Sequence, residues 1–297
     1  MSLSKNTTIV IVTYNGFILN KTLNRLNKKF KVIIVENSNL LKFKAQVEKK
    51  YKNIKVLLTK KNYGFAVANN LALKKVSTQF SLILNPDVSI NEKQVLELEK
   101  TAKKINNFGI LTCSCNGLLE TVTSYVDKFE KVNTNTSQTD KDLMEIPFVP
   151  GWCMFVKTKN LKKVKYFDEN FFLYFEDKDL SKRIKTKKNK LLIAKKIKIH
   201  HIFGRNSKIL KKKELREKSW HCRFWHFYWS SFYFYRKHYG FFTAFRIHLT
   251  KFLRFRYLSF FYKLINNRNL SELNRFKSNG ILSQFLNKKA LSGPIPG

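Results

Sequence analysis

Residues 7–15 read Thr-Thr-Ile-Val-Ile-Val-Thr-Tyr-Asn, a β-branched run that ends in two polar side chains. A run of this composition and length predicts a buried strand followed by a loop. Three further runs predict strands, at Lys31 to Glu36, Ile54 to Thr59 and Phe80 to Leu84. Three amphipathic stretches between them predict helices, at Asn20 to Lys29, Leu41 to Tyr51 and Phe65 to Val76. The alternation favours an α/β fold with a parallel, Rossmann-like sheet that binds ligands at the carboxyl ends of its strands.

The sequence after residue 90 predicts a second subregion and then a change of composition. A helix is expected at Asn91 to Ile105, a strand near Gly109 to Ser114, and a loop over the polar residues 128–142. An aromatic and acidic segment, Phe167 to Ile184, turns into a helix. From Ser219 to Ile265 the chain has no acidic residue. We therefore predict one α/β domain over residues 1–217 and a helical region over residues 218–297.

Charge and cysteine usage narrow the class of protein. The chain has 58 Lys and Arg against 20 Asp and Glu, a formal net charge of +38. Such an excess attracts polyanions, among them nucleic acid, anionic lipid and phosphorylated small molecules, although it is also typical of a solvated basic surface. The four cysteines form no CxxC pair and predict reduced thiols. With no visible export signal at the N-terminus, these features favour a cytoplasmic protein.

The C-terminal region combines aromatic and basic side chains. Residues 220–235 carry three of the four Trp, but charged side chains leave no run of about 18 apolar residues to cross a bilayer. From Phe242 to Leu264 apolar residues recur at steps of three or four, which predicts one amphipathic helix. We expect this region to lie in a membrane interface, with packing against protein as the alternative. The tail beyond Asn266 has no clear period and is expected to be partly mobile.

Polar side chains follow the predicted strands where a doubly wound sheet binds its ligands. Together with Gly64 and with Asn69 of the predicted helix, they give nine candidates for nucleotide or metal binding: Thr13, Tyr14, Asn15, Glu36, Asn62, Gly64, Asn69, Asn85 and Asp87. Backbone N–H groups and amides at a helix start suit a ribose or a phosphate. The carboxylate of Asp87 follows a buried strand and a proline, where it suits Mg²⁺ or Mn²⁺. Each pattern alone is also typical of a strand end, a turn or a helix cap.

In order and spacing, these segments resemble the nucleotide-binding half of the family 2 glycosyltransferases, which have the GT-A fold. The resemblance implies a GT-A domain over residues 1–217, with an acceptor-side subregion and a C-terminal appendage. Asn85-Pro86-Asp87 stands where the family has an Asp-x-Asp metal motif and is similar to that of rhamnosyltransferase-like members, which gives Asp87 the metal role. Glu36 stands where the family places an Asp that hydrogen-bonds a pyrimidine base.

The acidic segment at residues 167–183 is similar to the acceptor-side motif of the same family. The resemblance implies that Asp177 is the general base that takes the proton of the acceptor hydroxyl. Glu176 and Asp179 are expected to orient it or to form hydrogen bonds. Gly151 and Trp152 match the region that shapes the sugar and acceptor pocket. In isolation, the acids are also typical of a solvated helix start.

The segment from His200 to Ser207 is similar to the family's His-x-x-Gly motif, in which a histidine faces the metal-bound diphosphate. Alignment with this motif favours His201 over His200 as that histidine. As single residues, both histidines are more often structural or surface groups than diphosphate ligands.

The resemblance implies an inverting transferase that uses Mg²⁺ or Mn²⁺ and a dTDP- or UDP-linked sugar, best rhamnose or a similar hexose. The implied acceptor is a glycan or lipid-linked glycan in cell-surface polysaccharide synthesis, at an anionic membrane surface on the inner face of the cell membrane. No nucleic acid is expected as a partner. Two alternatives remain, a basic nucleic-acid-binding protein and an inactive family member that acts as a membrane scaffold. A dehydrogenase is excluded because no G-x-G-x-x-G follows the first strand.

Overall fold

The computed structural model describes residues 4, 6–16, 20–26, 29–105, 107–116, 118, 122, 142–186, 189–201 and 213–290. The chain divides into two compact units. The first comprises Met1–Lys61, Val67–Asp168 and Asp177–Phe203, and the second Asn62–Ala66, Glu169–Glu176 and Gly204–Gly297. Most of the predicted polar loop at 128–142, and Gly204 to Ser207 of the histidine segment, lie outside the described residues. The domain boundary at 217/218 stays a prediction.

Four parallel strands form one half of the sheet in the first unit. Their order is β3 (Ile54–Leu58), β2 (Lys31–Glu36), β1 (Thr7–Thr13) and β4 (Phe80–Leu84). β1 pairs in parallel with both β2 and β4, so the strand order reverses direction at β1. This confirms the predicted parallel sheet, and the β1/β4 junction is the place where such sheets bind ligands.

The other half of the sheet is mixed. β8 (Cys153–Lys157) runs antiparallel between β4 and β6 (Phe108–Cys115), and β6 pairs in parallel with β9 (Lys190–His201). Two short strands pair antiparallel with β9, namely β5 (Val88–Ser89) and β7 (Leu143–Glu145). The rings of Phe80, Phe108 and Phe155 pack together in the core, with centroids 5.0 Å apart for Phe80 and Phe155. β8 therefore joins the two halves through buried side chains as well as through backbone pairing.

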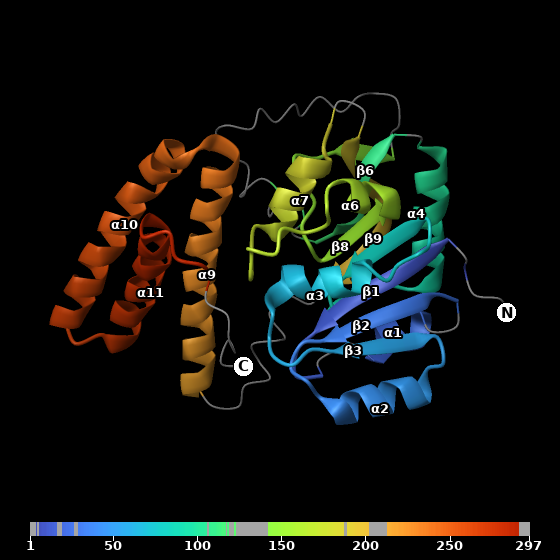
Figure 1. Ribbon diagram of the computed structural model, residues 1–297, viewed down its shortest axis with the longest axis horizontal. Coiled ribbons are helices and arrows are strands. Elements are labelled where there is room, and N and C mark those ends of the chain that lie inside the picture. Colours follow the sequence, from blue (N-terminus) through green and yellow to red (C-terminus); the bar gives the residue numbers. More distant parts are fainter. Residues whose placement is uncertain are drawn as a thin grey trace. The chain divides into compact units, whose positions relative to one another are not determined.

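Helices flank these strands in chain order, and the predicted α/β class is confirmed (Figure 1). They are α1 (Asn20–Leu26), α2 (Leu41–Lys50), α3 (Gly64–Leu73), α4 (Glu92–Lys104), α6 (Thr158–Lys163) and α7 (Glu176–Ile184). α4 begins with a reciprocal capping box, in which Asn91 and Gln94 each accept the other's backbone N–H. Such a box satisfies two N–H groups that the first turn leaves unpaired.

The second unit contains three long helices, α9 (Lys213–Tyr239), α10 (Phe241–Leu264) and α11 (Arg268–Phe285), which contact one another (Figure 1). No helix was predicted beyond Asn266, but α11 begins at Arg268; the expected partial mobility of the tail stays a prediction. Asn267 caps α11 by accepting the N–H of Leu270. α11 packs closely on α9 at Gly280, where a Cβ would lie 2.4 Å from the Trp225 carbonyl oxygen. Gly280 is thus required by contact, since any side chain would push the helices apart.

The aromatic run of α9 forms the core of this helical unit. Trp225, Trp229, Phe232 and Phe234 are all at most 5% exposed. Within the described residues, no helix combines the length and the apolar character that a membrane crossing requires.

Two buried histidines make the helical unit sensitive to acid. His226 stacks on Phe172, and His248 Nε2 lies 3.0 Å from the Ser231 hydroxyl. Burial lowers the pKa of each imidazole from 6.5 to about 4. Because the unfolded chain binds these protons near pH 6.5 and the folded chain does so only near pH 4, stability falls as the pH drops through that window.

We expect each histidine to contribute a loss on the order of 3 kcal/mol between pH 7.5 and pH 4. Urea unfolding followed by circular dichroism at both pH values measures it. His226→Phe keeps an aromatic ring against Phe172 and removes the titration, so its free energy of unfolding should fall less than that of the wild type. Equal losses for both proteins would contradict the assignment.

Candidate active site

The carboxyl ends of β1 and β2 are joined through the buried carboxylate of Glu36. Its oxygens accept hydrogen bonds from the N–H of Gly16 at 3.0 Å and the N–H of Ser38 at 2.9 Å, and also from the Ser38 hydroxyl. Asn15 donates its N–H to Ser38 Oγ at 3.0 Å. Burial raises the pKa of Glu36, while the donors from Ser38, Gly16 and Asn15 oppose that shift. Glu36 thereby fixes the loops after β1 and β2.

These loops carry the predicted nucleotide contacts of the first unit. Thr13 is buried, Tyr14 is half-buried and Asn15 is exposed with a left-handed φ of 55°. Burial raises the pKa of the Tyr14 hydroxyl, and the nearby Glu36 charge adds to the shift. Asn69 is buried on α3. The direct base contact predicted for Glu36 stays a prediction, but its carboxylate already accepts several donors from its own chain.

The short strand β5 brings Asp87 and His201 together. Its pairing with β9 sets Val88 opposite His201 and Ser89 opposite His200. Because side chains alternate along a strand, His201 turns inward while His200 is exposed. His201 Nε2 lies 3.1 Å from Asp87 Oδ1, and both side chains are at most 9% exposed.

Trp152 lies between the two candidate acids. Its carbonyl accepts the N–H of Asn85 at 2.9 Å, just after β4 ends. Its indole is 6% exposed, with the ring centroid 5.0 Å from that of His201. Trp152 therefore packs directly on the imidazole that faces Asp87.

Asp177 lies in the first turn of α7 and is tied to the residue before Trp152. Gly151 donates its N–H to Asp177 Oδ2 at 2.8 Å, and Lys178 donates its N–H to Oδ1 at 2.7 Å. One turn later, Ser181 Oγ accepts the N–H of Val149 at 3.0 Å. α7 thus holds residues 149–151 at two points.

The pKa of the Asp177 carboxyl is raised by burial, whereas the N–H donors of Gly151 and Lys178 oppose the shift. The two donors bind different oxygens of the carboxylate and hold it in one orientation. The carboxylate is thus oriented and more basic than an exposed Asp, as a general base requires.

Asp87 and Asp177, 90 residues apart in the sequence, flank the same dipeptide. Asp177 binds the N–H of Gly151, while Asp87 contacts His201, whose ring packs on Trp152. The two acids belong to the same compact unit. The contacts through Gly151, Trp152 and His201 link the candidate metal ligand to the candidate base.

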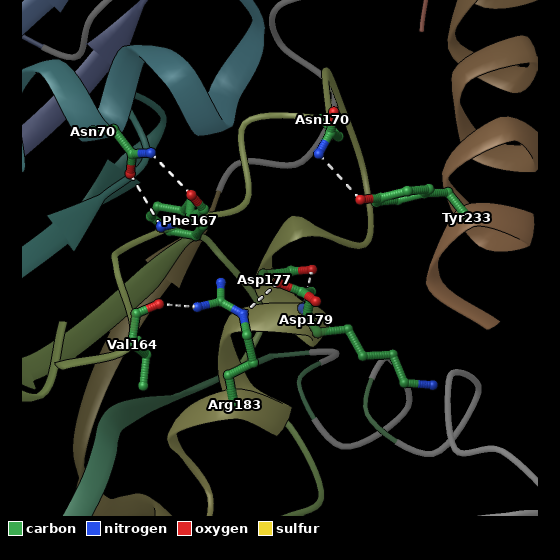
Figure 2. A network of polar contacts seen from close by, with 9 residues as sticks. Asn70, Val164, Phe167, Asn170, Asp177, Asp179, Arg183 and Tyr233 are labelled. Carbon is green, nitrogen blue, oxygen red and sulfur yellow. Dashed lines mark hydrogen bonds and ion pairs between the residues drawn. The ribbon is translucent and has the colours of Figure 1, made fainter. Parts of the chain in front are cut away.

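Asp179 has a different task from Asp177 (Figure 2). Its buried carboxylate accepts Arg183 Nε at 2.7 Å, one helical turn away. The same guanidinium donates to the Val164 carbonyl oxygen at 2.6 Å. Asp179 therefore anchors α7 to the segment after α6, in agreement with an orienting role.

Asn70, which was not predicted as a site residue, helps to build the site. Its side chain donates to the Phe167 carbonyl at 3.0 Å and accepts the Phe167 N–H at 3.1 Å (Figure 2). α3 thereby fixes the start of the acidic segment. The adjacent Asn69 and Asn70 on α3 were the signal in the sequence. The partner of Asn70, 97 residues away, is visible only in the fold.

Asn70→Ala should lower the free energy of unfolding by about 2–3 kcal/mol, since it removes two buried hydrogen bonds to the Phe167 backbone. Asn170→Ala is the matched control, because the hydrogen bond from Asn170 to Tyr233 is exposed and a surface change has effects within about 0.5 kcal/mol. Urea unfolding measures both, and equal effects would contradict the proposed anchoring.

Three predicted site residues, Asn62, Gly64 and Glu176, belong to the second unit. Asn62 Oδ1 accepts the Gly64 N–H at 2.9 Å. Gly64 has φ of 81°, and a Cβ there would lie 2.3 Å from the Phe172 carbonyl oxygen. Position 64 therefore requires glycine because its backbone packs closely on that of Phe172. This requirement is independent of the predicted contact with a nucleotide.

The backbone just before Glu176 is strained. Tyr174 and Phe175 both adopt left-handed φ values, 69° and 65°. A non-glycine residue held there costs on the order of 1–3 kcal/mol, and such strain is concentrated at functional sites. Aromatic contacts of Phe175 with Phe227 and Phe234 hold this turn in place.

The residues after β4 fit a divalent cation. Two ligands about 2.1 Å from an octahedral ion are separated by about 3 Å, and the Asp87 and His201 atoms are 3.1 Å apart. Asn85 Oδ1 is buried and has no hydrogen-bond partner within the described residues. In the described part of the chain, no cluster of three His, Cys, Asp or Glu forms a complete metal site. Asn85, Asp87 and His201 therefore suit an ion that takes its remaining ligands from a bound diphosphate.

Comparison with known proteins agrees with this arrangement. The family described as Glycosyl transferase family 2 matches residues 8–165. The low-salt glycan biosynthesis hexosyltransferase Agl10 of Haloferax volcanii is 23% identical over 181 residues, which cover 57% of this chain and 58% of that protein.

Two solved structures have the same fold. The mannosyltransferase PcManGT from Pyrobaculum calidifontis, in complex with GDP-Man and Mn²⁺, has a TM-score of 0.59 at 12% identity over 97% of this chain and 90% of its own. S. aureus TarS 1-349 in complex with UDP-GlcNAc has a TM-score of 0.51 at 14% identity over 95% of this chain and 92% of its own. The predicted GT-A fold class, with its C-terminal helical part, is confirmed.

The family match spans more than half of the chain. This protein therefore belongs to glycosyltransferase family 2.

Proposed function

We propose that this chain is a metal-dependent, inverting hexosyltransferase that moves a sugar from a nucleotide diphosphate donor to an acceptor hydroxyl. The observation that supports it best is the convergence of Asp87 and Asp177 on Gly151-Trp152. A cation-binding acid and an oriented base beside one segment are the two groups that this reaction requires.

The proposed reaction assigns one task to each group. Asp177 accepts the proton of the acceptor hydroxyl, and the acceptor oxygen forms a bond to the anomeric carbon on the face opposite the diphosphate. The bond from that carbon to the phosphate oxygen breaks, and the nucleoside diphosphate leaves with the electron pair. Asp87 and His201, with Asn85 nearby, would hold Mg²⁺ or Mn²⁺, which supplies positive charge against the leaving diphosphate.

For the donor, we propose a dTDP- or UDP-linked hexose, with rhamnose as the first choice from the Asn85-Pro86-Asp87 segment. The similarity to a hexosyltransferase supports a hexose, and the solved structures hold GDP-Man or UDP-GlcNAc. Thr13, Tyr14, Asn15 and the loop fixed by Glu36 would contact the base and ribose.

A panel of nucleotide sugars tests the proposal. The purified chain is incubated with dTDP-rhamnose, UDP-glucose, UDP-GlcNAc and GDP-mannose, each with Mg²⁺, Mn²⁺ or EDTA, and release of the nucleoside diphosphate is measured. We expect metal-dependent release from at least one donor. Release of the nucleoside diphosphate without a metal would contradict the proposal. So would a chain that releases it from no donor but binds a polynucleotide tightly.

For the acceptor, we propose a glycan or lipid-linked glycan in cell-surface polysaccharide synthesis, at the inner face of the cell membrane. The net charge of +38 supports a position at an anionic surface. Gly151 and Trp152, next to the Asp177 carboxylate, would shape the acceptor pocket. Glu176, which follows the strained turn at Tyr174 and Phe175, stays a predicted orienting residue.

A further inference from the structure

The outward face of α10 is an exposed apolar stripe. Its five members, which we call the α10 stripe, are 57–85% exposed: Phe242, Leu253, Tyr257, Phe260 and Leu264. At about 100° per residue, they fall within about 60° of one another around the helix axis. The buried residues of α10, Ala244, His248 and Phe255, lie on the opposite side. α10 thus has two apolar faces, and the helical unit buries only one.

Basic side chains surround the α10 stripe. The exposed ones on the same helix are Arg246, Lys251, Arg254, Arg256 and Lys263. The chain has no Asp or Glu from Ser219 to Ile265, so no acid on this helix offsets them. An apolar stripe on a helix that carries cations and no acids is the pattern of a helix that lies in the plane of a membrane interface.

We propose that the α10 stripe is a docking surface for an anionic lipid bilayer, an inference that rests on the membrane location in the proposed function. The rings and leucines of the stripe would enter the boundary between headgroups and acyl chains, and the flanking arginines would contact lipid phosphates. α10 is about 36 Å long at 1.5 Å per residue and would lie flat along the surface.

Two other occupants fit the stripe less well. A second copy of this chain would bring a second set of the same cations to the interface, because a two-fold interface uses the same surface on both subunits. A nucleic acid would match the cations, but it offers no apolar surface to Leu253 and Leu264. The bilayer satisfies both the charges and the leucines.

Vesicle sedimentation tests the proposal with the intact chain. We expect binding to vesicles with 30% anionic phosphatidylglycerol to exceed binding to pure phosphatidylcholine by about tenfold or more, and to weaken with added salt. The triple variant Leu253→Ser, Tyr257→Ser, Phe260→Ser should bind the anionic vesicles at least tenfold more weakly. Leu41→Ser with Leu286→Ser is the matched control, because both leucines are exposed outside α10, and it should bind like the wild type.

Further measurements separate the outcomes. The triple variant should keep the wild-type circular dichroism and the wild-type rate of nucleotide release, so that a loss of vesicle binding is distinct from failure of the transferase proposal. If it does not fold, Phe242→Ser alone, at a site 85% exposed, should lower vesicle binding severalfold. If the folded triple variant bound vesicles like the wild type, the proposal would be overturned. It would also be overturned if the substitutions changed a dimer to a monomer, or removed RNA binding, in place of vesicle binding.

Discussion

Asp177→Asn should lower kcat about 10³-fold while leaving the Kd for the donor within about threefold of the wild type. Asn has nearly the same shape, and its single side-chain oxygen can still accept the Gly151 N–H. Its amide nitrogen cannot accept the Lys178 N–H, so circular dichroism is used to compare the fold of the variant with that of the wild type. Asn cannot accept the proton of the acceptor hydroxyl, and general-base catalysis contributes about 10²- to 10⁴-fold. Calorimetry with the donor and a transfer assay measure the two quantities separately.

Glu169→Gln is the control for this change, because it also converts a carboxylate to an amide in the acidic segment, at an exposed site. It should retain wild-type turnover. If Asp177→Asn turned over as fast as the control, Asp177 would not be the base.

The pH dependence of the wild type follows from the environment of Asp177. Burial raises its pKa, so kcat/KM should fall with acid at a pH above the ordinary range of an aspartate, near 4. The base works in its ionised form, hence activity is lost as the pH drops through the raised pKa and is present above it. If the residual activity of Asp177→Asn showed the same fall of kcat/KM at low pH, that fall would belong to another group.

Asp87→Asn should lower metal-supported turnover by about 10²-fold or more, because the cation would lose its charged protein ligand. The Mn²⁺ concentration for half-maximal activity should rise, and the added affinity that Mn²⁺ gives to nucleoside diphosphate binding should disappear.

The two adjacent histidines supply a matched comparison for the cation site. His201→Ala should weaken Mn²⁺ dependence in the same direction as Asp87→Asn, since the imidazole lies 3.1 Å from that carboxylate. His200→Ala, on the opposite face of β9, should leave turnover unchanged. Equal effects of the two histidine variants would remove His201 from the site.

Much of the first unit could be predicted because its signals are local. The β-branched runs of β1 to β4 and the amphipathic segments between them give a parallel sheet, and a parallel sheet sets its polar strand ends at one edge. Asp87 follows directly, since it comes three residues after the last residue of β4.

The contacts that assemble the site are long-range, and no local pattern contains them. The pairing that brings His201 to Asp87 involves only two residues of β5. Sequence pattern alone does not show that Asp179 binds the Arg183 guanidinium whereas Asp177 binds backbone N–H groups. The partner of Asn70 is likewise set by tertiary packing.

α11 was missed for a different reason. Four of its five buried residues are small or polar, namely Asn274, Ser278, Gly280 and Gln284, with Ile281 the fifth. A helix that packs through such residues shows no apolar period, although its N-cap at Asn267 was readable. The helix predicted from the apolar period between Phe242 and Leu264 is present as α10, and much of its predicted apolar face is exposed.

The most direct test of the account is anomalous diffraction from crystals grown with Mn²⁺ and a nucleoside diphosphate, UDP or dTDP. We expect one manganese peak within about 2.3 Å of both Asp87 Oδ1 and His201 Nε2, with a diphosphate bound to the same ion. We also expect the Asp177 carboxylate to face the space next to the bound diphosphate. A manganese peak and diphosphate away from Asp87, or an Asp177 carboxylate separated from the diphosphate by the protein core, would contradict it.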